Sequence, residues 1–217
     1  MEFIVSVFQK GGPIMYPLLI LGVLSIALIV ERFYSLSLKR VIPTKVLEEI
    51  DFYIREKRFA EAFTIARSKN SLATEVIAAI LNAYLSGRRK KEDLIAFAEE
   101  AAKIEIPKLE TLVNALGAIA AIAPLLGFLG TVTGMIQVFE ALSIEGLGNP
   151  DVLAKGISQA LLTTAFGLTI AIPSIAAYWF FRNKVTFIVA QVENIAMNLV
   201  YELVSLEETQ EEERNES

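Results

Sequence analysis

The chain of 217 residues contains no cysteine and no histidine. Without cysteine it cannot form a disulfide, a thiolate metal site or a cysteine nucleophile. Without histidine it lacks the side chain that most often carries protons near neutral pH. Any proton chemistry must therefore use carboxylates, hydroxyls, water or groups from another polypeptide, and no metal or cofactor is expected.

Other absences narrow the function further. The sequence presents no nucleophile–base pair of the kind used in covalent catalysis, so it does not predict an enzyme. The formal net charge is −5, and a basic face that could hold phosphates is missing, so no nucleic-acid partner is expected. The many charged side chains of residues 39–110 are most simply the solvated faces of helices.

Charge is missing altogether from two long stretches, residues 111–139 and 156–181. About 20 helical residues cross the ~30 Å hydrocarbon core of a bilayer, so each stretch is long enough to span it. A third apolar run, residues 14–30, follows an N-terminus without a basic region or cleavage site and is interpreted as a retained span. The composition, 54% hydrophobic with a mean hydropathy of +0.51, is that of a membrane protein.

The predicted fold is an all-α membrane protein with three transmembrane helices and long cytoplasmic helical extensions. Ser71 is the candidate N-cap and Gly87 the candidate C-cap of a helix within the large loop, while Pro107 either kinks or ends a helix there. The expected segments are an N-terminal amphipathic segment (1–12), a first span (13–38), a cytoplasmic helical loop (39–110), a second span (111–140), a periplasmic connector (141–155), a third span (156–182), and a cytoplasmic C-terminal helix with an acidic, disordered tail (183–217).

The distribution of basic residues predicts the orientation. Residues 39–110 hold 14 of the 20 Lys and Arg side chains, whereas the connector 141–155 holds only Lys155. Because basic residues are retained in the cytoplasm, the large loop and the C-terminus are expected inside and the N-terminus in the periplasm. The expected location is the bacterial inner membrane, with several passes.

The two uncharged spans carry more small and polar residues than a lipid anchor needs. Serine and threonine in membrane helices often bond only to their own backbone, and a buried amide is often no more than a contact between helices. The alternative is that the hydroxyls and the amide line a polar path. The candidate path residues are Thr131, Gln159, Thr163 and Thr164, and the candidate packing or kink residues are Pro124, Gly127, Gly130, Gly134, Gly167 and Pro173.

None of the three apolar runs contains an aspartate, glutamate, lysine, arginine or histidine. A proton path through a membrane generally needs a group that binds and releases the proton. If this chain conducts protons, the titrating carboxylate must therefore come from another polypeptide, and the hydroxyls and Gln159 would hold water along the path.

The stretches APLLGFLGTVTGMIQVF (residues 123–139) and GISQALLTTAFGLTIAIP (residues 156–173) resemble the ExbB/TolQ/MotA family of proton-channel subunits. The three spans and the large loop after the first resemble ExbB and TolQ most closely, and the missing fourth span disfavours a flagellar or gliding stator. In the motif, Thr131 and Thr164 match the family's pore-lining threonines, and Pro124 and Pro173 match its helix prolines.

The resemblance implies a ring of copies of this chain, a pentamer in the better-known members. The ring would surround single helices of a smaller ExbD- or TolR-like partner that carries an intramembrane aspartate. Proton flow past that aspartate would energise a TonB- or TolA-like protein. ExbB and TolQ often carry glutamate where this chain has Gln159, so a proton-carrying role at this position is not expected.

Two other functions remain open from the residues alone. One is a non-conducting membrane scaffold that anchors a cytoplasmic helical bundle, and the other is an independent channel for small solutes. A neighbouring one-span protein with an intramembrane Asp would favour the motor subunit over the scaffold. Solute flux through the isolated chain would favour the channel.

Overall fold

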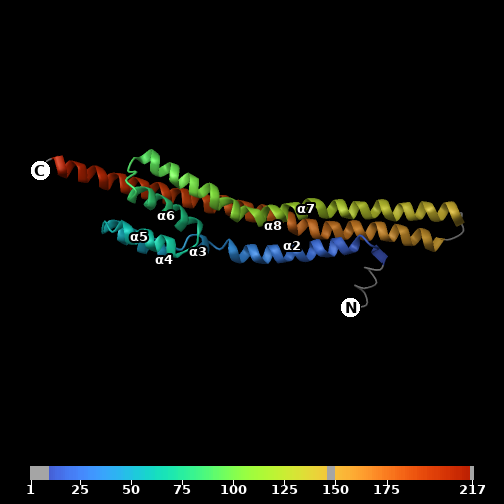
Figure 1. Ribbon diagram of the computed structural model, residues 1–217. Helices are drawn as coiled ribbons and strands as arrows, with labels where there is room; N and C mark the ends of the chain where they lie inside the picture. The colour runs from blue at the N-terminus through green and yellow to red at the C-terminus, as the bar shows by residue number, and fades with distance from the viewer. Residues whose placement is uncertain (1–9, 146–149, 216–217) are drawn as a thin grey trace. The chain divides into compact units, whose positions relative to one another are not determined.

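The computed structural model describes residues 10–145 and 150–215, and within these ranges every regular element is a helix (Figure 1). The all-α prediction is therefore confirmed. The amphipathic segment expected at residues 1–12 lies mostly outside the described residues. The helices are α2 (Met15–Ser35), α3 (Leu38–Val41), α4 (Thr44–Arg55), α5 (Phe59–Ser68), α6 (Leu72–Leu85), α7 (Lys91–Glu145) and α8 (Pro150–Asn215).

Three of the described helices, α2, α7 and α8, are long and apolar enough to cross a membrane. This confirms the three predicted spans, and the chain is a multi-pass membrane protein. The helix α2 has 21 residues, about the length that a bilayer requires, whereas α7 and α8 each continue well beyond that length. The limits of the membrane-embedded parts stay a prediction.

The helix α7 runs through Pro107 without ending, which rules out the expectation that a helix ends at that proline. Proline removes one backbone donor and crowds the preceding turn, but strong helix formers flank it on both sides. The carbonyl of Pro107 accepts a hydrogen bond from the Thr111 hydroxyl at 2.7 Å. The second span is thus the continuation of a helix that begins at Lys91.

The sequence prediction was wrong about the C-terminal part. We expected a separate helix after residue 182 and a disordered acidic tail, but α8 is one helix from Pro150 to Asn215. Glutamate, glutamine and arginine favour helix, and a segment that extends an existing helix avoids the unfavourable nucleation step. The acidic composition therefore did not prevent helix formation up to Asn215.

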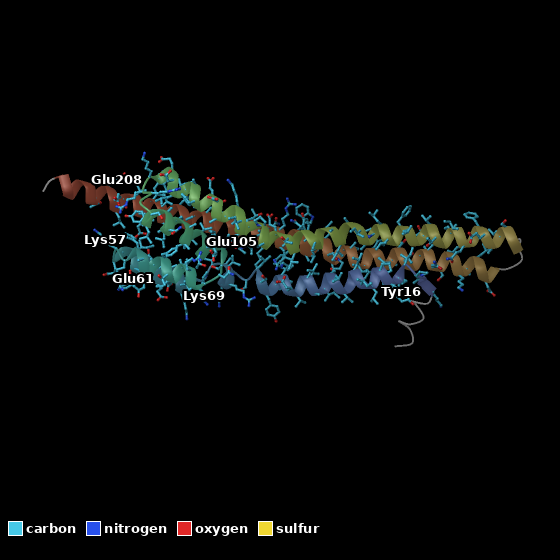
Figure 2. All side chains as sticks on the ribbon, viewed as in Figure 1. Tyr16, Lys57, Glu61, Lys69, Glu105 and Glu208 are labelled. Atoms are coloured by element: carbon cyan, nitrogen blue, oxygen red, sulfur yellow. The ribbon has the colours of Figure 1, made fainter. Side chains whose placement is uncertain are left out.

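The chain divides into two compact units. The first, called the transmembrane unit, comprises Met1–Arg32 and Leu112–Phe181, and the second, called the extramembrane unit, comprises Phe33–Thr111 and Arg182–Ser217. The helices α7 and α8 contribute to both units. In Figure 2, side-chain nitrogens and oxygens gather around α4, α5 and α6, whereas the side chains along α2 are mostly carbon.

The extramembrane unit has its core at α6, which is apolar around nearly its whole circumference and buries Ile77, Ile80 and Leu81. The helix α5 packs against α6, and α4 packs against α5. Ser71 caps α6 in a reciprocal capping box with Thr74, which confirms the predicted N-cap. Gly87 follows the helix with φ +86°, the left-handed conformation expected of a glycine at a helix C-terminus.

Candidate functional site

The two uncharged spans meet along a stripe of small residues in the transmembrane unit, here called the glycine seam. A methyl group added at Gly127 would lie 2.9 Å from the backbone oxygen of Thr163, and one at Gly167 would lie 2.6 Å from that of Ala123. Because real Cβ atoms essentially never come within 3.0 Å, only glycine allows the two backbones to approach this closely. The seam consists of Gly127, Gly130 and Gly134 on α7 and Gly156 and Gly167 on α8.

Thr163 occupies the space that Gly130 leaves on α7. The threonine is fully buried, and a methyl group at Gly130 would lie 2.4 Å from the Thr163 Cβ atom. Its hydroxyl donates to the carbonyls of Gln159 (3.1 Å) and Ala160 (3.0 Å) of its own helix. In this arrangement Thr163 packs within the seam, and its proposed place on a polar path would require it to become exposed.

Several other hydroxyls also donate to carbonyls of their own helix, which is one of the two interpretations that the sequence allowed. Thr131 donates to the Phe128 carbonyl at 2.6 Å, and Thr169 donates to the Ala165 carbonyl at 2.7 Å. These bonds satisfy the hydroxyl donor and leave the oxygen lone pairs free to accept from water or a ligand. Back-bonding and a lining role are therefore compatible.

Thr164 differs from these residues because its hydroxyl reaches the neighbouring helix. It donates to the Gly127 carbonyl of α7 at 3.4 Å, a long and therefore weak bond. Thr164 is half-buried, as is Thr131, which lies one helical turn beyond Gly127 on α7. The two matched threonines thus place partly exposed hydroxyls beside the seam.

Gln159 lies deep within the transmembrane unit, with 5% of its surface exposed. Its side-chain amide faces Gly12, where an added methyl group would lie 2.7 Å from the Gln159 Nε2 atom. Gly12 has φ +72°, so it provides both the open space and the left-handed backbone that a side chain would disfavour. A neutral amide suits such a position better than a carboxylate, because burying an unpaired charge is costly.

Sequence reasoning missed a hydrogen bond between the first and third spans. The hydroxyls of Ser25 on α2 and Ser174 on α8 lie 2.7 Å apart, and both side chains are buried. Ser174 also bonds to the Ile170 carbonyl at 2.6 Å. The available signal was that Ser25 is the only serine or threonine in the apolar run 14–30.

The two prolines lie inside their helices. Pro124 is half-buried on α7 and Pro173 is exposed on α8, and neither ends its helix. Because Pro173 has no N–H, the carbonyl of Thr169 loses its usual helical donor and is free to accept another bond. The packing residues of the prediction thus fall into two groups, the glycines at the seam and the prolines within the helices.

The seam contains no charged side chain, since residues 111–139 and 156–181 are entirely uncharged. It offers hydroxyls and an amide, which bind water and stabilise a nearby charge but do not carry a proton themselves. Chemically, this part of the chain is a polar wall without an acidic or basic side chain. A proton that crosses the membrane beside it needs a carrier from elsewhere.

Comparison with known proteins agrees with this chemistry. An ExbB-like protein 1 of Synechocystis sp. is 36% identical over 170 residues, which cover 76% of this chain and 65% of that protein. The biopolymer transport protein exbB1 of Vibrio cholerae is 28% identical over 81% of this chain and 78% of its own length. The Tol-Pal system protein TolQ of Haemophilus influenzae is 35% identical over 47% of this chain and 43% of its own length.

The relatives carry both names, ExbB and TolQ, as the sequence motif led us to expect. The model of the MotA/TolQ/ExbB proton channel family matches residues 68–194. This range includes the whole of α6 and α7, α8 as far as residue 194, and the whole of the glycine seam. The match covers more than half of the chain, which therefore belongs to the MotA/TolQ/ExbB proton channel family.

Proposed function

We propose that this chain is the ring-forming subunit of a proton-driven motor in the bacterial inner membrane, resembling ExbB or TolQ. In this proposal several copies surround the single span of an ExbD- or TolR-like partner. The motor uses the proton-motive force, about 2.3 kcal/mol per charge per 100 mV, to energise a TonB- or TolA-like protein. The chain itself performs no catalytic turnover of a substrate.

The observation that carries the proposal is the uncharged seam flanked by half-buried Thr131 and Thr164. A partner's aspartate would supply the titrating group, because the wall supplies none. Burying a charged carboxylate near the bilayer centre costs at least about 2.5–3.5 kcal/mol. Hydroxyl donors beside it would lower that cost and let the carboxylate exchange its proton.

Each candidate residue has a distinct part in this proposal. Thr131 and Thr164 would contact the path directly, with their free lone pairs facing water or the partner. Gln159 and Thr163 would join the path only if α8 turned or the seam loosened, since both are buried. The glycines of the seam would hold the two walls together and fix the spacing of the hydroxyls.

The test replaces Thr131 or Thr164 by valine, which keeps the shape and removes the hydroxyl. Losing one hydrogen bond of about 0.5–1.5 kcal/mol corresponds to a roughly two- to tenfold lower rate. Partner-dependent proton flux in vesicles is the measurement, with the assembled complex quantified in parallel. Thr169→Val is the matched control, since this exposed threonine of α8 donates its hydroxyl hydrogen to the Ala165 carbonyl of its own helix. Normal flux in both variants would remove the lining role.

A second measurement addresses Gln159. If the position reaches the path, Gln159→Glu introduces a titratable group and makes flux depend on pH in a way that the parent chain does not. If Gln159 only packs against Gly12, the pH profile stays unchanged.

Two outcomes would favour other functions. Solute flux through the chain reconstituted without a partner would indicate an independent channel. Normal assembly with the partner but no proton flux in any vesicle preparation would indicate a scaffold that anchors the extramembrane unit.

A further inference from the structure

A pocket of about 250 Å³ opens in the extramembrane unit. Unlike the uncharged seam, it is lined in part by charged side chains. Its polar lining comes from three separate parts of the chain: Ser35 at the end of α2 with Arg40 shortly after it, Asn70 before α6, and Glu105 with Lys108 on α7. Figure 2 labels Glu105. Residues far apart in the sequence thus form a single polar cavity.

The pocket carries a net positive charge. Arg40 and Lys108 contribute two positive charges and Glu105 one negative charge, which leaves +1. Lys108 pairs with Glu105, but among the residues that the structure describes no carboxylate forms an ion pair with Arg40. The Arg40 side chain is exposed, so its guanidinium is available to a ligand. Guanidinium groups bind phosphate oxygens in pairs, which makes an anionic phosphate the ligand best matched to the site.

In the sequence, the residues that line the pocket lie close to the ends of the predicted membrane spans. Ser35 is the last residue of α2, and Lys108 precedes the start of the uncharged residues 111–139 by three positions. Both chain segments therefore enter the bilayer within a turn or two of the pocket. With the membrane-embedded runs placed as the sequence predicts, a phosphate at Arg40 would lie at the depth of lipid headgroups.

The remaining lining is apolar. Val41 and Leu72 are buried and Leu109 is half-buried, and all three border the cavity. A free inorganic anion gains nothing from contact with apolar side chains, whereas the glycerol and ester region next to a lipid phosphate can pack against them. The Ser71 hydroxyl also borders the pocket, but it is engaged in the capping box with Thr74 and is left out of the binding set.

We propose that this pocket binds the phosphate-bearing headgroup of an anionic phospholipid. Arg40 contacts the phosphate, Lys108 adds a second cation, and Asn70 and Ser35 hydrogen-bond the polar groups beside it. Glu105 opposes binding and limits its strength. The inference does not depend on the proposed motor, since a chain that conducts nothing would bind the lipid equally well.

The test measures retention of phosphatidylglycerol, compared with phosphatidylcholine, by the full chain in detergent with native mass spectrometry. Arg40→Gln is expected to weaken phosphatidylglycerol binding about fivefold, which corresponds to about 1 kcal/mol. Lys39→Gln is the matched control, because this exposed neighbour removes the same charge but does not line the pocket. Glu105→Gln is expected to strengthen binding, a gain that a merely damaged variant would not show.

Three results would overturn the proposal. Equal losses in the Lys39 and Arg40 variants would mean that diffuse charge, and not the pocket, attracts the lipid. Equal retention of the two lipids would mean that the site does not recognise the headgroup. Displacement of the lipid by an equal concentration of inorganic phosphate would identify the ligand as a free anion.

Discussion

At the scale of single residues, Gly130 has very little room for a side chain. A methyl group there would lie 2.2 Å from the Thr163 hydroxyl oxygen, and Thr163 is a β-branched, fully buried side chain that cannot swing away easily. We expect Gly130→Ala to destabilise the transmembrane unit by about 1–3 kcal/mol through overpacking. Thermal unfolding followed by the fluorescence of the only tryptophan, Trp179, would measure it.

Gly22→Ala provides the matched control for this experiment. Gly22 also lies in a membrane-spanning helix, but its added methyl group would meet only Ile170, at an ordinary 3.4 Å. The unfolding temperature of this variant should stay close to that of the parent chain. Equal effects of the two substitutions would show that helix propensity or lipid contact, and not the seam, determines the result.

The serine pair between α2 and α8 predicts an asymmetry. Ser174 keeps its bond to the Ile170 carbonyl when Ser25 is replaced, whereas Ser25 loses its hydrogen-bond partner on α8 when Ser174 is replaced. We therefore expect Ser174→Ala to cost more stability than Ser25→Ala, with a coupling of roughly 0.6 kcal/mol between them. A double-mutant cycle on unfolding temperature would measure the coupling. A coupling of zero would show that the pair contributes no stability.

The residue scale also shows what the sequence could not reveal. The spacing of the glycines indicated helix contact, and Gly127, Gly130 and Gly134 do lie at the α7–α8 seam. That spacing did not identify Thr163 as the residue that fills the gap, because a helical wheel gives directions and not partners. Nor could it place Gln159 against Gly12, a contact between positions 147 residues apart.

At the scale of elements, α8 is anchored within the extramembrane unit by polar contacts near its end. The Tyr84 hydroxyl of α6 donates to the Glu207 carboxylate at 2.9 Å, and Arg89 pairs with the same carboxylate. Burial and then the neighbouring Glu207 raise the pKa of Tyr84 to about 12. The tyrosine thus remains a neutral donor throughout the physiological range.

The half-buried Glu202 on α8 predicts that the stability of the extramembrane unit depends on pH. Burial and then the charge of Asp51 raise the pKa of Glu202, while Arg55 opposes the change. A carboxyl group whose folded-state pKa is raised stabilises the fold fully below its unfolded pKa of 4.5, and this contribution is lost as pH rises through the folded value. At neutral pH, ionised Glu202 therefore weakens the contact with α4.

We expect Glu202→Gln to stabilise the contact of α8 with α4 at neutral pH, because the amide resembles the protonated acid. Hydrogen exchange of the α4 amides should slow in the variant. The difference should vanish below pH 4.5, where the parent carboxyl is protonated in both states. Slower exchange that persists in acid would mean that packing, and not charge, is responsible.

Element boundaries were predictable where local chemistry sets them. Ser71 and Gly87 have the side chain and the backbone freedom that helix ends require, and both lie where the sequence placed them. The continuity of α8 was not predictable from the change in composition after residue 182. Charged residues follow apolar ones there, but a helix can continue through such a change because its backbone hydrogen bonds form with either kind of side chain.

At the scale of the whole molecule, the three spans and the all-helical fold followed directly from hydropathy, because the bilayer requires helices of this length. The orientation of the chain remains a prediction from its basic residues. The absence of cysteine makes it straightforward to measure, since every label then reports one introduced site.

Ser143→Cys and Ser205→Cys are a matched pair for this measurement. Both serines are exposed, and cysteine is nearly isosteric with serine. With the connector 141–155 in the periplasm, a membrane-impermeant maleimide should label the first variant in intact spheroplasts and the second only after lysis. The reverse pattern would invert the proposed topology.

The glycine seam affects how the protein adapts to bilayers of different thickness. Backbone contact fixes the tilt of α7 against α8, so these two helices cannot adjust separately when the hydrocarbon layer thins or thickens. The helix α2, with 21 residues and about 32 Å of length, has no such backbone contact with them at Gly22. Hydrophobic mismatch would therefore be relieved mainly by tilting α2 about its hydroxyl contact at Ser25.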